Sequence, residues 1–101
     1  MRERDVERIL IREVKRRGGL CLKFVSPGWD GAPDRIVLLP GGKLCFVEVK
    51  RPGGKPRPLQ EARLRQLGKM GFQTYILDEP ERIPDLLDFL ITDGGGVFVK
   101  P

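Results

Sequence analysis

The sequence predicts an α/β domain in which helices flank one mixed sheet, in the order α-β-β-β-α-β. Near the N-terminus, apolar residues recur with the spacing of one helical face, as in Leu10, Ile11 and Val14. Between residues 20 and 50, short apolar runs alternate with segments rich in Gly and Pro, which is typical of strands joined by turns. A length of 101 residues suits a single domain, 1–101, with one sheet and a few helices.

The first half of the chain is expected to form one helix and three strands. These elements are a helix over residues 3–17, a strand over 20–25, and a hairpin whose strands cover 34–39 and 43–50. A Gly-Gly pair ends the helix, and a Pro-Gly-Gly sequence forms the hairpin turn. The segment before the hairpin is rich in turn residues and is expected to be a loop.

The second half begins with a flexible basic loop. The elements expected after it are a helix from residue 58 to about 71, a strand over 72–77, a helix over 81–91, and a run at 97–99 that either adds an edge strand or frays. Pro58 suits the first position of its helix, Leu59 supplies an apolar contact there, and Pro84 interrupts the last helix early. The first three strands can form an antiparallel meander, and the fourth can lie parallel to one of them after a helical crossover.

The charge is distributed unevenly along the chain. The formal net charge is +5, but residues 50–69 alone carry a net charge of +6. A basic segment of this kind either follows a polyanion or is a solvated helix face. Composition alone favours the solvated face.

The absence of histidine excludes several classes of active site. A Ser-His-Asp triad, a Cys-His pair and a histidine zinc site all need a residue that the chain lacks. Any hydrolysis must therefore use carboxylates, lysine and a hard metal ion. Cys21 and Cys45 lie in apolar runs, so buried free thiols are expected. With no apolar run as long as a membrane span, we expect a soluble cytoplasmic protein.

Three charged residues are expected to converge at one end of the hairpin. Side chains alternate along a strand, so Glu48 and Lys50 share a face, and antiparallel pairing brings Asp34 beside them. Two carboxylates can hold a hard divalent cation, and a nearby ammonium can act on bound water or on a phosphate. The alternative is that Asp34 only caps a turn while Glu48 and Lys50 form an ion pair.

Further residues have two interpretations each. Glu7 is either a supporting acid or a surface residue at the edge of the helical stripe. Gln60 orients a phosphate or a carboxylate, or is a solvated helix residue. Trp29 stacks on a base or plugs an apolar gap, and the plug is favoured. Basic residues that would contact phosphates are Lys55, Arg57, Arg63 and Lys69.

Three motifs together resemble the VRR-NUC domain, a branch of the restriction-endonuclease-like PD-(D/E)XK nucleases. They are Gly-Ala-Pro-Asp-Arg at 31–35, Phe-Val-Glu-Val-Lys at 46–50, and Pro-Leu-Gln at 58–60. The resemblance runs from Glu7 to about Leu77, and the expected element order also matches the core of that superfamily. The chain departs from the Val-Arg-Arg pattern behind the family name, because Val-Glu-Val-Lys stands there.

The resemblance implies roles for the matching residues. Asp34, Glu48 and the Val49 carbonyl would bind Mg²⁺ or Mn²⁺, and Lys50 would position or deprotonate the attacking water. Glu7 and Gln60 stand where the family has supporting helix residues. The resemblance also implies that stand-alone members from phages and bacteria resemble Holliday-junction resolvases and act as homodimers, whereas fused members cut flap structures.

The function expected from these observations is metal-dependent, structure-selective DNA cleavage. A homodimeric resolvase of four-way junctions is the first hypothesis, because two opposed nicks need two sites related by a two-fold axis. A flap or linear-duplex nuclease of the same superfamily is the second. A catalytically inactive DNA-binding module is the third.

Overall fold

The computed structural model describes residues 1–92 and confirms the expected order of elements. Helices and strands follow as α1 (Glu3–Arg16), β1 (Leu20–Lys23), β2 (Arg35–Leu39), β3 (Lys43–Val49), α2 (Pro58–Lys69), β4 (Gln73–Leu77), a 3₁₀ turn (Pro80–Arg82) and α3 (Ile83–Thr92). The edge strand expected at residues 97–99 lies outside the described residues.

The four strands form one mixed sheet in the order β1-β2-β3-β4. The meander β1-β2-β3 is antiparallel, and β4 returns parallel to β3 after the α2 crossover. The Pro-Gly-Gly turn lets both Gly41 and Gly42 adopt positive φ, which residues with a side chain rarely do. The hairpin register is therefore set within a few residues of the turn.

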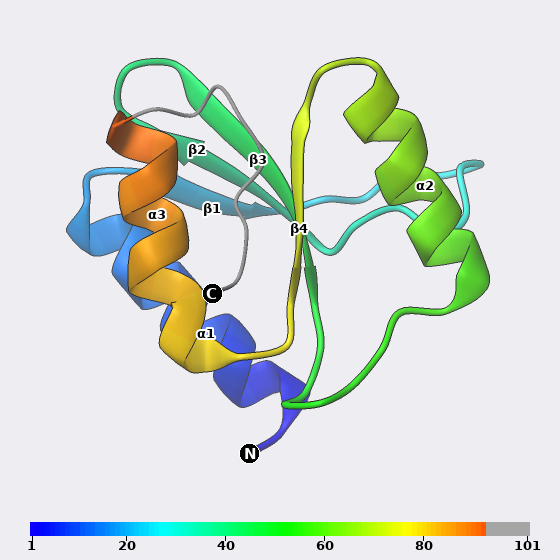
Figure 1. The fold of residues 1–101 in the computed structure, drawn as a ribbon, viewed down its shortest axis with the longest axis horizontal. Coiled ribbons are helices and arrows are strands. Elements are labelled where there is room, and N and C mark those ends of the chain that lie inside the picture. The colour runs from blue at the N-terminus through cyan, green and yellow to red at the C-terminus, as the bar shows by residue number, and fades with distance from the viewer. Residues whose placement is uncertain (93–101) are drawn as a thin grey trace.

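Helices cover both faces of the sheet (Figure 1). α1 and α3 lie together on one face, and α2 lies on the other. The main core forms on the α1–α3 face, because alternate strand residues point there: Val37, Leu39, Cys45, Val47, Val49, Tyr75 and Leu77 pack against apolar residues of the two helices. By the same alternation, Phe46 and Glu48 point toward the α2 face. Within residues 1–92, no helix combines the length and hydropathy needed to cross a membrane.

Three local predictions were wrong. β1 ends at Lys23 rather than at residue 25, although the Phe24 amide still donates to the Asp34 carbonyl at 2.9 Å. Pro84 lies in the first turn of α3, where a missing N–H is not needed, so it does not interrupt the helix. Leu59 contacts Gly31 in the loop before β2 and not the sheet, so it stays 46% exposed while α2 buries Gln60, Leu64 and Leu67.

Both cysteines are free. Cys21 and Cys45 are both register partners of Val37, one on each side of β2. The intervening strand keeps their backbones apart, so the thiols are free as expected, but only Cys45 is buried, whereas Cys21 is half-buried.

Candidate metal centre

Asp34 lies beside the end of β3. Arg35 is the register partner of Val47, so the residue before β2 falls next to Glu48 and Val49. The Val49 amide donates a hydrogen bond of 2.9 Å to Asp34 Oδ2. This bond joins residues fifteen positions apart and fixes the Asp34 carboxylate at the point where β3 ends.

Glu48 is the most unusual residue of the sheet. It is 0% exposed, yet among residues 1–92 neither of its carboxylate oxygens has a well-aligned hydrogen-bond partner. The Lys50 ammonium lies 3.2 Å from Oε2, which is ion-pair distance without good hydrogen-bond alignment. Burying a carboxylate charge with so few partners costs roughly several kcal/mol, unless a positive group besides Lys50 compensates the charge. The side chain therefore has coordination capacity that the described residues leave unused.

Both carboxyl groups have a raised pKa. Burial raises the pKa of Glu48, and the negative charge of Asp34 raises it further, while Lys50 opposes both effects. Burial also raises the pKa of Asp34, and the Val49 hydrogen bond opposes that rise. A divalent cation between them would remove both the repulsion and the missing solvation. The environment of Asp34 and Glu48 therefore suits two carboxylates that bind a hard metal ion better than two carboxylates without one.

The backbone at the end of β3 adds a third oxygen. The Lys50 amide donates to the Leu77 carbonyl of β4 at 2.9 Å. Because N–H and C=O point in opposite directions across a trans peptide, the Val49 carbonyl points away from β4, toward the side of Asp34. Within residues 1–92, no group of three Cys, Asp or Glu side chains lies close enough to hold one metal ion. Two carboxylates with a carbonyl, completed by water or phosphate oxygens, would be a donor set that Mg²⁺ accepts.

These pKa shifts predict how the stability of the metal-free protein depends on pH. A carboxyl group with a raised folded pKa destabilises the fold while it is ionised, so stability should rise as the pH falls through the folded values of Glu48 and Asp34. Arg17 and Arg16 lower the pKa of Glu13, so its contribution is lost as the pH falls below its usual 4.5. Thermal melts in EDTA should therefore show greatest stability at mildly acidic pH, above 4.5. A stability that falls steadily from pH 8 downward would contradict this assignment.

Glu7 approaches the site from α1 but already has a partner. Its Oε2 accepts a 2.8 Å hydrogen bond from Arg35 Nε, and the same guanidinium reaches the Cys21 carbonyl at 3.4 Å. The Glu7 charge is close enough to contribute to the raised pKa of Asp34. Sequence reasoning missed Arg35 as the partner of Glu7. The available signal was a charged residue opening a largely apolar strand, which needs an acid on the helix that covers it.

Gln60 is buried at 8% exposure, so its interpretation as a solvated residue is wrong. Its Oε1 accepts a 2.8 Å hydrogen bond from the Arg57 amide, which satisfies an N–H at the start of α2. The side chain thus fixes the helix start directly after the basic loop. Among the four expected phosphate contacts, Lys55, Arg57 and Lys69 are exposed, whereas Arg63 is half-buried.

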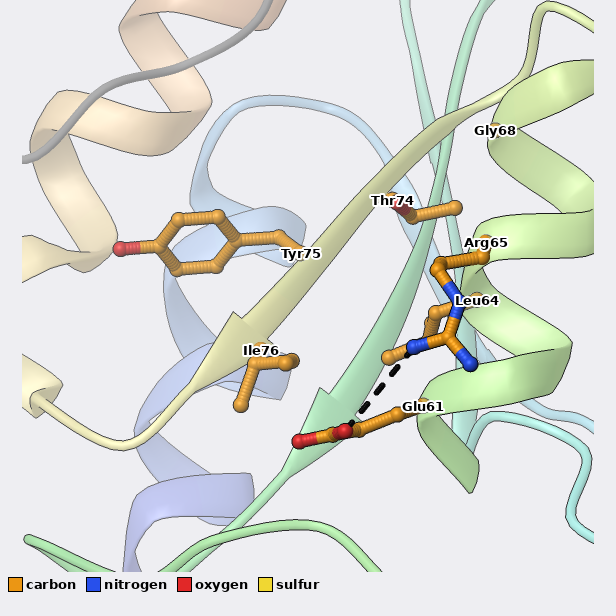
Figure 2. A pocket seen from close by; sticks show the side chains of 7 residues that line it. All are labelled: Glu61, Leu64, Arg65, Gly68, Thr74, Tyr75 and Ile76. Atoms are coloured by element: carbon orange, nitrogen blue, oxygen red, sulfur yellow. Dashed lines mark ion pairs between the residues drawn. The ribbon is translucent and has the colours of Figure 1, made fainter. Parts of the chain in front are cut away.

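A pocket of about 360 Å³ lies between α2 and β4 (Figure 2). Its lining residues are Glu61, Leu64, Arg65, Gly68, Thr74, Tyr75 and Ile76. Glu61 and Arg65 face each other at 3.9 Å. Ile76 is the register partner of Glu48, but none of the candidate metal ligands lines the pocket. The pocket therefore lies beside the candidate metal centre and does not contain it.

Comparisons with known proteins give clear similarities to nucleases and to a solved domain structure. A curated protein named "Putative nuclease p44", from Acyrthosiphon pisum secondary endosymbiont phage 1, is 47% identical over 81 residues, which are 80% of this chain and 87% of that protein. A solved structure described as "VRR_NUC domain" superposes with a TM-score of 0.79 at 30% sequence identity, covering 85% of this chain and 94% of the other. No family model matches the chain.

Proposed function

The chain belongs to the VRR_NUC-domain nucleases, and we propose that it is a divalent-metal-dependent endonuclease that cuts branched DNA. One observation carries the proposal. The buried Glu48 carboxylate lies beside Asp34 with unused oxygens, and Lys50 shares its face of the sheet. Residues 1–101 would form one such nuclease domain.

Asp34, Glu48 and the Val49 carbonyl would hold Mg²⁺ or Mn²⁺. A divalent ion there supplies charge neutralisation at the phosphate and lowers the pKa of water. Lys50 would orient the attacking water and face the phosphate with its ammonium. Asp34 is oriented by the Val49 amide and Glu48 by its fully buried strand position, so both carboxylates are arranged before substrate binds. Glu7, held by Arg35, and Gln60, at the start of α2, would support the site from the two helices.

The DNA backbone would follow the basic segment at residues 50–69, which begins at Lys50 itself. Lys55, Arg57 and Lys69 are exposed there and can reach phosphates. Such contacts position DNA without reading its sequence, which agrees with recognition of shape. A homodimer with two-fold symmetry would place two sites on one four-way junction. Two protomers would also contact more of the branched DNA than one domain of 101 residues can contact alone.

Removing the Asp34 carboxylate should abolish cleavage. We expect Asp34→Ala to cut at least about 1,000-fold more slowly, because metal ligation supplies several kcal/mol of the barrier reduction. DNA affinity in EDTA should stay within about twofold, since the exposed basic residues are untouched. The measurement is a cleavage panel of four-way junction, flap, linear duplex and single strand, with Mg²⁺ and with Mn²⁺.

Asp30→Ala is the matched control, because it removes an exposed acid of the same loop and keeps the Asp30 backbone carbonyl, which accepts a hydrogen bond from Arg63. This variant should cleave DNA at the wild-type rate. Full activity of Asp34→Ala would exclude the metal assignment. If the wild type prefers flaps or linear duplex, the proposed substrate is wrong but the proposed metal-dependent cleavage still holds. Absence of cleavage on every substrate would favour a DNA-binding module without activity.

A further inference from the structure

The loop that delivers Asp34 to the metal centre is held against α2. It connects β1 to β2 over residues 24–34, and its ends are joined by the hydrogen bond from the Phe24 amide to the Asp34 carbonyl, 2.9 Å. Between these ends the chain contacts two other parts of the fold, the helix α2 and the aromatic side chains on the α2 face of the sheet. The position of Asp34 therefore depends on more than β2 alone.

Arg63 of α2 makes the strongest of these contacts. Its Nε donates a 2.7 Å hydrogen bond to the Asp30 carbonyl, and its guanidinium lies 4.9 Å from the ring centroid of Trp29. A second nitrogen reaches Gln66 Oε1 at 3.3 Å. A charge-assisted hydrogen bond is stronger than a neutral one, and the ring face of Trp29 attracts the same cation. The guanidinium is thus committed to the loop and not displayed as a free phosphate contact.

The loop also contacts α2 through its backbone. Gly31 has φ +81°, and a Cβ at this position would lie 2.8 Å from Leu59 Cγ and 3.2 Å from the Leu59 backbone. No side chain fits between the loop and the first turn of the helix. This close approach explains why glycine stands there, three residues before Asp34.

On its other side, Trp29 joins a row of aromatic rings. Phe24 lies 6.3 Å from Trp29 and 5.6 Å from Phe46, measured between ring centroids. Phe46 precedes Glu48 by two residues in β3, so the two side chains share a face. The row therefore connects the Trp29 loop to the strand that carries the second carboxylate.

We propose that Arg63 and Trp29 form a clamp that positions Asp34 for metal binding. Arg63 is then a positioning residue that acts through the loop, and its loss weakens the metal site while leaving DNA binding intact. This rests on the proposed function, because it takes Asp34 as a metal ligand. It also separates Arg63 from Lys55, Arg57 and Lys69, the exposed basic residues of the same segment.

The test compares Arg63→Ala with Arg65→Ala. Each variant removes one positive charge from α2, but the Arg65 side chain is 67% exposed and its nearest acid, Glu61, is 3.9 Å away. Mn²⁺ affinity is measured by calorimetry and should fall about tenfold or more in Arg63→Ala, as when supporting partners of metal ligands are removed. It should be unchanged in Arg65→Ala. Trp29 is the sole tryptophan of the chain, so it is the source of the tryptophan fluorescence. This fluorescence should change in folded Arg63→Ala and stay as in the wild type in Arg65→Ala.

DNA binding in EDTA supplies the opposite readout. A lost phosphate contact lowers the salt dependence of binding by about one unit of slope. The slope should stay at the wild-type value in Arg63→Ala. Arg63→Lys keeps a cation over Trp29 and should restore most of the Mn²⁺ affinity.

An Arg63→Ala protein with wild-type Mn²⁺ affinity and a reduced salt slope would overturn the clamp. If that variant does not fold, Trp29→Leu decides, because it removes the cation–π partner and keeps an apolar side chain; unchanged Mn²⁺ affinity there would overturn the clamp as well. Asp34→Ala distinguishes the two levels. If Asp34→Ala retains the wild-type Mn²⁺ affinity, both the proposed metal site and the clamp are wrong. If Asp34→Ala loses Mn²⁺ affinity and Arg63→Ala does not, only the clamp is wrong.

Discussion

Replacing Glu48 by Gln is expected to stabilise the metal-free protein and at the same time to abolish cleavage. Glu48 is fully buried, and burial and Asp34 both raise its pKa, so its ionised form is unfavourable in the folded state at neutral pH. An amide of the same shape removes that charge together with its ion pair to Lys50. Because burial and Asp34 raise the pKa by more than Lys50 lowers it, we expect a net gain of roughly 1 kcal/mol in the free energy of unfolding. The same change removes a proposed metal ligand, so cutting should fall at least about 1,000-fold.

The opposite signs of these two effects make the Glu48→Gln experiment informative. Urea unfolding in EDTA measures the stability, and cleavage of a four-way junction with Mg²⁺ measures the activity. Glu61→Gln is the control, because Glu61 is exposed and should leave both quantities near the wild-type values. A Glu48→Gln protein that is less stable than the wild type would show that the carboxylate already has sufficient partners in the fold.

Divalent cations should raise the thermal stability of the wild type strongly. A ligand that binds only the folded state at 100 times its Kd stabilises it by about 2.7 kcal/mol. For a domain of this size that corresponds to a rise in Tm of roughly 10–20 °C. The ion would relieve the repulsion between Asp34 and Glu48 that raises the pKa of Glu48. Melting curves with increasing Mg²⁺ or Mn²⁺ provide the measurement.

The variants define the specificity of this metal effect. Asp34→Ala and Glu48→Gln should each lose most of the rise in Tm, while Asp30→Ala should keep it. An equal rise in all four proteins would place the ion elsewhere on the chain. Reversal by EDTA would confirm that the wild-type rise depends on a bound cation.

The approach of Asp34 to the end of β3 could be predicted because it depends on local rules. Strand alternation places Glu48 and Lys50 on one face, and a three-residue turn sets the hairpin register that brings Asp34 to them. The parallel return of β4 followed from the crossover rule. These relations hold within one or two neighbouring elements, and a single sequence contains them.

The partners of the surrounding residues could not be predicted in this way. The pairing of Glu7 with Arg35 requires knowing where α1 crosses the sheet, and the sequence pattern gives only the face of each element. Arg63 turns inward because the 24–34 loop folds back onto α2, which no periodicity encodes. Gln60 is likewise buried, where its side chain accepts a hydrogen bond from the Arg57 amide. Tertiary packing therefore decides which charged and amide side chains are already paired within the fold and which can bind a ligand.

The 24–34 loop is held at both ends by a hydrogen bond within the loop itself, so its tip can vary while its ends stay fixed. Its ends are joined by the Phe24–Asp34 bond, its C-terminal part is anchored by Arg63, and a Cβ at Gly28 would meet nothing within 4 Å. The Trp29 amide closes the tip with a 3.1 Å hydrogen bond to the Ser26 carbonyl, so the turn presents Gly28 outward from a fixed base. Added length at Gly28 would cost little closure entropy, but it would have to preserve this turn to keep Trp29 against Arg63.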